Sequence, residues 1–252
     1  MSIEIRKLTF RYSNFTLDVP KLFLESARMT SIVGPNGAGK TTLLKCISAV
    51  LPVKKGSLFI DGRDLTELRG VERARHLAYV PQEHGSVFNY RVLDFVLMGR
   101  AAYHFPLSSP SRTDVRVAEE ALAFVGLCHF SSRPYFELSS GERRLVLIAR
   151  ALAQNSDILL LDEPTSFLDP KHEIEILELS RRLAAEKKKT VLITLHNLDM
   201  AVRYSDMMVF MKNGGVFASG RAADILAEEL LEEVYEIPMK IIPYDGKKLI
   251  VI

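Results

Sequence analysis

A nine-residue run reads Gly34-Pro-Asn-Gly-Ala-Gly-Lys40-Thr41-Thr42 and carries the complete spacing G-x-x-x-x-G-K-[S/T]. Glycines at this spacing let successive backbone N–H groups close around a phosphate, because no Cβ blocks the approach. An apolar run at 29–33 precedes it and a helical pattern follows it, so the N-terminus of a helix faces the anion. Lys40 can reach the β- and γ-phosphates, and the Thr41 hydroxyl can ligate Mg²⁺. The sequence therefore predicts a nucleoside triphosphate site where a strand meets a helix.

The composition is that of an ordinary globular chain. Its 252 residues are 48% hydrophobic, enough for one large domain or for one domain with an insertion. A net charge of +2 with 25% charged residues argues against a nucleic-acid partner. The two cysteines, Cys46 and Cys128, are isolated in apolar helical patterns, so we expect both in the core of a protein from a reducing compartment. The N-terminus has no signal pattern, and no apolar run approaches the roughly 18 residues of a membrane span.

Hydrophobic periodicity predicts how the chain is divided. Strands are expected at 2–10, 15–19, 56–62, 77–80, 158–163 and 190–195, and helices at 92–101, 111–125 and 142–154. We therefore expect an α/β fold with a mainly parallel sheet, an N-terminal antiparallel β part and an inserted helical subdomain. The predicted boundaries are residues 1–83 and 156–252 for the nucleotide-binding core, and 84–155 for the helical subdomain. A small hairpin with an Asp-Gly turn is expected at 241–250.

Polar residues follow three of the apolar strands. Asp162 and Glu163 end the run at 158–163, as a candidate Mg²⁺ partner and a candidate base. Two adjacent carboxylates are costly to keep ionised unless a cation or a substrate proton shares their site, so a functional role is favoured. Gln82 ends another strand, where its amide can orient a water or contact Mg²⁺. His196 ends a third; such a histidine is more often structural, but its position beside catalytic strand ends favours function.

Taken in chain order, these features resemble the ATP-binding subunit of an ABC transporter over essentially the whole chain. The family's seven motifs correspond to Tyr12 (the aromatic A-loop), 34–42 (Walker A), Gln82 (Q-loop), Leu138-Ser139-Ser140-Gly141-Glu142 (signature), 158–163 (Walker B), Ser166-Phe167-Leu168-Asp169 (D-loop) and His196 (switch histidine). The implied fold is a P-loop NTPase of the ABC ATPase type with a RecA-like core.

The resemblance also implies the cofactors, ATP and Mg²⁺, and a role for each site residue. Glu163 polarises the attacking water, His196 contacts the γ-phosphate, Lys40 holds phosphates, and Gln82 completes the catalytic set. Mg²⁺ is surrounded by Thr41, Gln82 and Asp162. The implied nucleotide contacts are Tyr12, Asn36, Gly37, Ala38, Gly39, Lys40, Thr41, Thr42, Ser139, Gly141 and Asp169. Ser139 and Gly141 reach ATP from a second copy of the chain, so the resemblance implies a homodimer that closes on ATP.

Three residues depart from the family pattern. Ser140 replaces a glycine of the signature, which suggests that this backbone position need not be left-handed. Glu142 replaces a glutamine and is expected to add negative charge near the triphosphate, weakening dimer closure. Phe167 stands where the family more often has a small residue, and is expected to alter dimer contacts.

A subfamily resemblance suggests the transported molecule. The segments at 79–82 and 88–100 are similar to importers for iron-siderophores, haem, cobalamin and molybdate or tungstate. The implied partners are transmembrane permease subunits at the cytoplasmic face of the membrane and, indirectly, an extracytoplasmic substrate-binding protein. The segment is expected to form the groove for the permease, with its lining supplied by Phe88, Tyr90, Val92, Phe95 and Met98. In the competing interpretation, Val92, Phe95 and Val96 are the core face of an amphipathic helix.

Other classes stay open at this stage. An exporter ATPase with a separate membrane chain is the nearest, although a chain without a fused membrane domain favours an importer. A soluble ABC ATPase acting on DNA or ribosomes usually has two cassettes or a long coiled-coil insertion. A P-loop kinase needs neither a signature motif nor a partner subunit, and it would stay monomeric with ATP.

Overall fold

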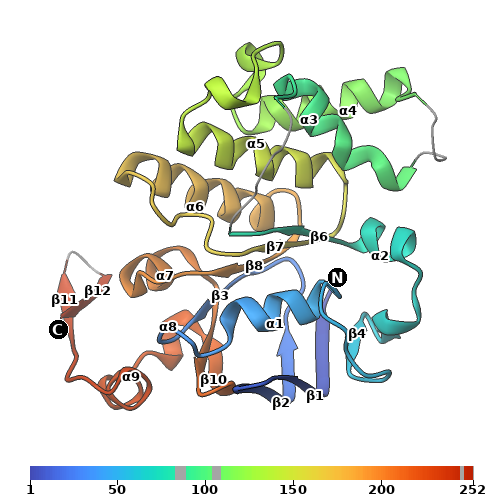
Figure 1. The fold of residues 1–252 in the computed structure, drawn as a ribbon. Helices are drawn as coiled ribbons and strands as arrows, with labels where there is room; N and C mark the ends of the chain where they lie inside the picture. The colour runs from blue at the N-terminus through green and yellow to red at the C-terminus, as the bar shows by residue number, and fades with distance from the viewer. Residues whose placement is uncertain (83–88, 104–108, 245–246, 252) are drawn as a thin grey trace.

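A computed structural model describes residues 1–82, 89–103, 109–244 and 247–251. Its centre is a six-stranded sheet in the order β10-β9-β3-β8-β7-β6 (Figure 1), in which β10 alone is antiparallel to its neighbour. The strands are β3 (Met29–Val33), β6 (Leu77–Val80), β7 (Ile158–Leu161), β8 (Thr190–Thr194), β9 (Met207–Lys212) and β10 (Gly215–Arg221). The predicted mainly parallel sheet is confirmed.

A second, antiparallel sheet holds the N-terminal part, as predicted. Its order is β2-β1-β4-β5, and its strands are β1 (Ile3–Tyr12), β2 (Phe15–Leu24), β4 (Leu58–Ile60) and β5 (Arg63–Asp64). The prediction ended β2 at Val19, before Pro20, which has no N–H to donate. The strand continues because the β1–β2 ladder omits Pro20 and Lys7 across from it and resumes on both sides. Lys7 takes a positive φ of 48° there.

The central sheet is buried on both faces, which is why its strands are continuous apolar runs. Ile158 and Leu160 of β7 face α1 (Lys40–Ile47) and the N-terminal sheet. Leu159 and Leu161 face the opposite side, covered by α5 (Ser140–Ala153) and α6 (Pro170–Ala185) (Figure 1). The phosphate-binding run therefore lies at the edge of the layer between the two sheets.

The predicted helices of the inserted segment are present. They are α3 (Val92–Leu97) continued by η2 (Met98–Tyr103), α4 (Arg112–Phe124) and α5. Ser111 caps α4, and Gly126 follows its end with a φ of 78°. Many residues of these helices belong to the same apolar cluster as Val33 of β3. The boundaries at 83/84 and 155/156 stay a prediction, and residue 83 lies outside the described residues.

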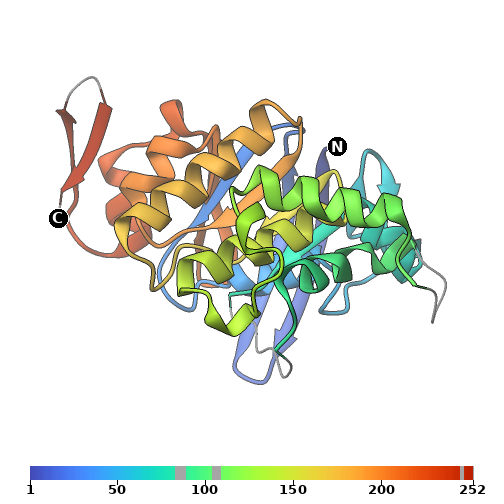
Figure 2. The same ribbon diagram turned by 90° about the horizontal axis from the view of Figure 1, so that it is seen from above.

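The remaining elements were not predicted from the sequence, apart from the two strands of the C-terminal hairpin. One of them is α2 (Gly70–His76). The others are η1 (Leu65–Glu67), η3 (Cys128–Phe130), η4 (Tyr135–Glu137), α7 (Leu198–Tyr204), α8 (Ala222–Ile225), α9 (Glu228–Tyr235), β11 (Lys240–Tyr244) and β12 (Lys247–Val251). β11 and β12 form the expected antiparallel hairpin, whose Asp-Gly turn at 245–246 lies outside the described residues. Figure 2 shows this hairpin at one end of the molecule, apart from the inserted helices, which lie at its centre and toward the other end.

Two predictions about apolar residues were wrong in part. Cys46 is buried, and burial raises the pKa of its thiol to about 12. Cys128 is exposed instead, because η3 is a short surface turn and not part of a core helix.

Among the described residues, no helix combines the length and the apolar character of a membrane span.

The proposed lining of the permease groove also needs correction. Val92, Phe95 and Val96 are buried in the core, as the competing interpretation held. They face inward because α3 packs its apolar face on α4 and α5. Tyr90 and Met98 are exposed. Phe88 lies outside the described residues.

The first prediction concerns how η2 packs on α5. A Cβ at Gly99 would lie 2.1 Å from the backbone oxygen of Arg150, whereas a Cβ at Gly70 meets open space. Gly99→Ala should lower the free energy of unfolding by about 1–3 kcal/mol through overpacking. Gly70→Ala, the matched control, should change it by less than about 0.5 kcal/mol. Urea denaturation of both variants measures this, and equal losses would contradict the packing described.

Candidate functional site: a nucleotide site at the sheet edge

The phosphate-binding run links β3 to α1 through glycines that no other residue can replace without strain. Gly34 has a φ of 147°, and a Cβ there would lie 2.2 Å from the backbone oxygen of Met211. Gly39 precedes α1 with a φ of 101°, and a Cβ there would lie 2.7 Å from the Phe15 ring. No side chain caps α1 at Gly39, so the first N–H groups of the helix stay open to an anion.

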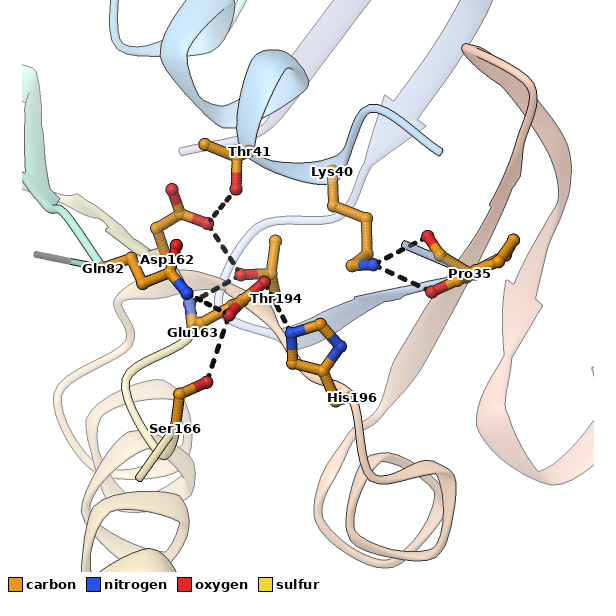
Figure 3. A network of polar contacts seen from close by, with 10 residues as sticks. Pro35, Lys40, Thr41, Gln82, Asp162, Glu163, Ser166, Thr194 and His196 are labelled. Carbon is orange, nitrogen blue, oxygen red and sulfur yellow. Dashed lines mark hydrogen bonds and ion pairs between the residues drawn. The ribbon is translucent and has the colours of Figure 1, made fainter. Parts of the chain in front are cut away.

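Lys40 is buried at the start of α1. Its Nζ donates to the backbone oxygens of Gly34 (2.8 Å) and Pro35 (3.1 Å), as Figure 3 shows. Burial lowers the pKa of Lys40, while the charges of Glu163 and Asp162 oppose that shift. The ammonium therefore has two neutral acceptors that phosphate oxygens can replace.

Asp162 is the most enclosed acid of the site, with 1% of its surface exposed. Thr41 Oγ1 (2.9 Å) and Thr194 Oγ1 (3.0 Å) donate to its Oδ1. Tyr79 Oη donates to its Oδ2 at 3.0 Å. These donors come from α1, β8 and β6, because β7 lies between β6 and β8 and the three parallel strands end at one edge.

Glu163 is the point on which the other predicted catalytic side chains converge. Gln82 Nε2 donates to its Oε2 at 2.5 Å, and Ser166 Oγ donates to the same oxygen at 3.1 Å. His196 Nε2 lies 2.6 Å from its Oε1 (Figure 3). The structure therefore brings Gln82, Glu163 and His196 together beside Lys40 and Asp162, as the sequence predicted.

A cavity of about 340 Å³ opens over this group. It is lined by Tyr12, Phe15, Asn36, Gly37, Gly39, Lys40, Thr41, Thr42 and Glu163. Tyr12, one of these lining residues, is half exposed, and its ring packs edge-on against Phe10. Ala38 is buried and does not line it; its backbone oxygen accepts from Gly214 N–H at 3.1 Å.

The signature residues lie elsewhere in the same chain. Ser139, Gly141 and Asp169 do not line this cavity. Ser139 caps α5, accepting from Glu142 N–H at 3.3 Å, and Glu142 Oε2 accepts from Ser139 N–H at 2.7 Å. This capping box accounts for the glutamate, since the motif takes glutamate or glutamine at its third helical position. The Ser139 N–H also lowers the pKa of Glu142. Ser140 begins the helix and, as expected, is not among the residues with positive φ.

Asp169 and Gly141 are connected through His172, which the sequence analysis missed. Asp169 caps α6 by accepting from the N–H groups of Lys171 and His172, and its Oδ2 lies 2.5 Å from His172 Nδ1. The His172 side chain lowers the pKa of Asp169. A Cβ at Gly141 would lie 2.4 Å from the His172 ring, so only glycine fits between α5 and this ring.

Tyr79 and Thr194 were also missed as members of the site. Their signal was present, because both lie within three residues of a predicted strand-end group, Gln82 or His196. Strand alternation alone does not say which neighbouring side chain turns toward Asp162.

The residues around Asp162 fit a magnesium ion. Thr41, Asp162 and Gln82 supply only oxygen ligands, the kind that Mg²⁺ prefers. Within the described ranges, no group of three or more His, Cys, Asp or Glu side chains is placed to hold a metal by itself. That donor set suits an ion that keeps several waters and binds through substrate phosphates.

A P-loop between two sheets, an acidic strand end and a capped signature helix together define an ATP-binding cassette. The family model described as ABC transporter matches residues 17–166. The achromobactin transport ATP-binding protein CbrD of Dickeya dadantii is 37% identical over 96% of this chain and 90% of its own length. The iron(3+)-hydroxamate import ATP-binding protein FhuC of Bacillus subtilis is 33% identical over 91% and 83%.

Solved structures agree with these relatives. An inward-facing ABC transporter described as of metal-chelate type has a TM-score of 0.85 and 30% identity, over 99% of this chain and 95% of that one. A bacterial ABC transporter cassette solved as a dimer has a TM-score of 0.74 and 26% identity, over 87% and 98%. The chain belongs to the ABC transporter family and is an ATP-binding ATPase. Within the family it belongs to the siderophore, haem and metal-chelate import subfamily.

The second prediction tests Lys40. Lys40→Ala removes a charge-assisted donor to phosphate, so ATP hydrolysis should fall by about 100-fold or more. Lys45→Ala, on the same helix but outside the cavity lining, should keep turnover within about two-fold, as substitutions away from such features usually do. A phosphate-release assay on variants with native circular dichroism measures both. Wild-type turnover in a folded Lys40→Ala protein would overturn the assignment.

Proposed function

We propose that this chain hydrolyses ATP to power the import of a metal chelate. The observation that carries the proposal is the convergence of Gln82 and His196 on Glu163, beside Lys40 and Asp162. Membership in the siderophore, haem and metal-chelate subfamily supports this substrate class. Cobalamin and an oxyanion such as molybdate are further candidates from the resemblance of the sequence. In this proposal the subunit works at the cytoplasmic face of the membrane, bound to permease subunits that receive cargo from an extracytoplasmic binding protein.

The chemistry required of the site is positioning and charge stabilisation. Mg²⁺, held by Thr41, Asp162 and Gln82, neutralises phosphate charge when bound. Lys40 exchanges its two backbone acceptors for phosphate oxygens. Glu163 polarises the attacking water, and the side chains of Gln82 and His196 keep its two oxygens in place.

In this proposal the His196 ring also contacts the γ-phosphate. Its Nε2 lies 2.6 Å from Glu163 Oε1, so the imidazole is next to the carboxylate that polarises the attacking water. Tyr12, which also lines the cavity, stacks on the adenine in this proposal.

A second copy of the chain supplies the missing donors. Ser139 and Gly141 lie at the N-terminus of α5, away from the cavity of their own chain. A helix N-terminus favours an anion, so this end of α5 suits the γ-phosphate bound by a partner. Support comes from the similar bacterial cassette solved as a dimer. In this arrangement ATP joins the two subunits, and its hydrolysis releases them.

The third prediction tests dimer closure. Glu163→Gln keeps the side-chain volume but removes the base, so ATP should bind, stay uncleaved and trap a dimer. Light scattering at saturating Mg-ATP should show a doubled mass for Glu163→Gln and a monomer for Lys40→Ala.

A companion variant separates the effect of Glu142. Glutamine also completes a capping box, so Glu142→Gln should keep α5 stable while removing a negative charge. If Glu163→Gln is monomeric and the double variant with Glu142→Gln is dimeric, the glutamate opposes closure. If both stay monomeric, the isolated subunits do not close on ATP as proposed.

An exposed apolar surface suits the permease. Tyr90, Met98 and Phe136 are each more than a third exposed. Tyr90 and Phe136 lie together, because Tyr135 N–H donates to Tyr90 O at 2.8 Å and Phe136 N–H donates to Asn89 Oδ1 at 3.1 Å. A surface of this kind on the inserted helices can accept an amphipathic helix of a partner.

The fourth prediction concerns the transported molecule. The subunit, reconstituted with the permease encoded beside it, should show ATPase stimulation by a binding protein loaded with a metal chelate, haem, cobalamin or an oxyanion. Stimulation only by sugar- or amino-acid-loaded proteins would contradict the substrate class and leave the ATPase standing.

The same assay tests whether the exposed apolar surface of Tyr90, Met98 and Phe136 contacts the permease. Met98→Ser should lose the stimulation and keep the basal rate. Val50→Ser, at an exposed apolar residue that follows α1 and lies outside the inserted segment in the sequence, should keep both. Equal effects of the two variants would show that Met98 does not contact the permease.

A further inference from the structure

The hydroxyl of Thr194 joins the two acids of the site. Thr194 ends β8 and is fully buried. Its Oγ1 donates to Asp162 Oδ1 at 3.0 Å and accepts from Glu163 N–H at 2.7 Å (Figure 3). One side chain therefore fixes a carboxylate of the first acid and the backbone of the second.

The backbone of Glu163 needs this support. Its φ of 44° is in the left-handed region, which a residue with a Cβ adopts at a cost in free energy. Its N–H is buried, so losing the Thr194 acceptor leaves a donor unsatisfied. The direction of the Glu163 side chain follows from this backbone conformation, and it is this direction that meets Gln82 and His196.

Tyr79 holds the other oxygen of Asp162. Its Oη donates to Oδ2 at 3.0 Å from β6, while Thr194 donates to Oδ1 from β8. The two strands flank β7, so the carboxylate is fixed from both sides. Thr41, the third donor, is the one that can turn to a metal ion while the other two remain.

We propose that Thr194 and Tyr79 are positioning residues for ATP hydrolysis. Thr194 sets the backbone of Glu163 and one oxygen of Asp162, and Tyr79 sets the other oxygen. The inference rests on the roles proposed above for Glu163 and Asp162. Neither hydroxyl touches the nucleotide in this assignment, and both act through the acids.

The fifth prediction compares threonines of one strand. Thr194→Val keeps the shape and removes the hydroxyl, so kcat should fall about 10- to 100-fold, the loss typical of a small misplacement of a reacting group. The KM for ATP should change by less than about three-fold, because the hydroxyl positions the acids and does not contact the nucleotide. Thr194→Ser keeps the hydroxyl and should recover most of the rate.

Thr190→Val is the matched control. Thr190 is also buried on β8, and its hydroxyl also makes two hydrogen bonds, from Ala27 N–H at 3.0 Å and to Met1 O at 2.6 Å, away from the cavity. It should lower the melting temperature as Thr194→Val does but leave kcat within about two-fold. The inference is overturned if the two valine variants lose kcat equally or if Thr194→Ser is as slow as Thr194→Val.

Tyr79→Phe gives a readout that does not depend on turnover. Electron paramagnetic resonance of Mn²⁺ titrated into the ATP-bound protein should show about ten-fold weaker Mn²⁺ binding, as for other supporting partners of metal ligands. Affinity for ATP in EDTA should be unchanged. Unaltered Mn²⁺ binding would overturn the part assigned to Tyr79, and this variant also decides the case if Thr194→Val does not fold.

The experiments distinguish failure of the positioning role from failure of the proposed function. If Glu163→Gln stops hydrolysis but Thr194→Val matches Thr190→Val, the function stands and the positioning role falls. If Glu163→Gln hydrolyses ATP at the wild-type rate, the assignment of the base itself falls.

Discussion

Two carboxylates buried side by side at the end of β7 impose the main constraint on this structure. Removing a charge from water is costly unless hydrogen bonds and opposite charge replace the solvent. Asp162 receives hydroxyl donors on both oxygens, Glu163 receives an amide, a hydroxyl and an imidazole, and the buried ammonium of Lys40 lies near both. The strand order β3-β8-β7-β6 is what makes these donors available, because each neighbouring strand ends beside the acids.

The N-termini of α1, α5 and α6 differ in how their first N–H groups are satisfied. The first N–H groups of α1 have no side-chain cap and stay open to phosphate. Those of α5 and α6 are capped by Ser139 and Asp169 through local hydrogen bonds. His172 then connects the two capped ends, since its ring bonds to Asp169 and packs on Gly141. The signature and the D-loop therefore behave as one structural unit in each chain.

The sequence predicted the parts of the site that local spacing encodes. The glycines at 34–39 are needed for the backbone angles of the phosphate-binding run itself. Two carboxylates at the end of an apolar strand, Asp162 and Glu163, cost free energy unless a cation or a substrate shares their site. The contacts that were missed depend on packing between distant segments. Thr194 and Tyr79 point to Asp162 because β7 lies between their strands. The sequence of neither strand reveals the order of the strands in the sheet.

The errors have the same origin. Val92 and Phe95 carry a helical apolar pattern that fits either a groove or a core, and only the packing of α3 on α4 and α5 decides between them. The strand predicted at 15–19 stops before Pro20, but the β1–β2 ladder omits only Pro20 and Lys7 and then resumes. The expected effect of Glu142 on dimer closure stays a prediction, because the hydrogen bond from Ser139 N–H to its carboxylate is made within one chain.

Phe167 connects the buried acids to the molecular surface. It is 96% exposed and has a φ of 62°, an unfavourable conformation for a large side chain. The residue before it, Ser166, donates to Glu163 Oε2, and two residues after it Asp169 caps α6. The turn is short and held at both ends, with Leu168 N–H donating to Thr165 O at 3.3 Å. The exposed ring therefore belongs to a short turn in which the preceding residue, Ser166, hydrogen-bonds the buried carboxylate of Glu163.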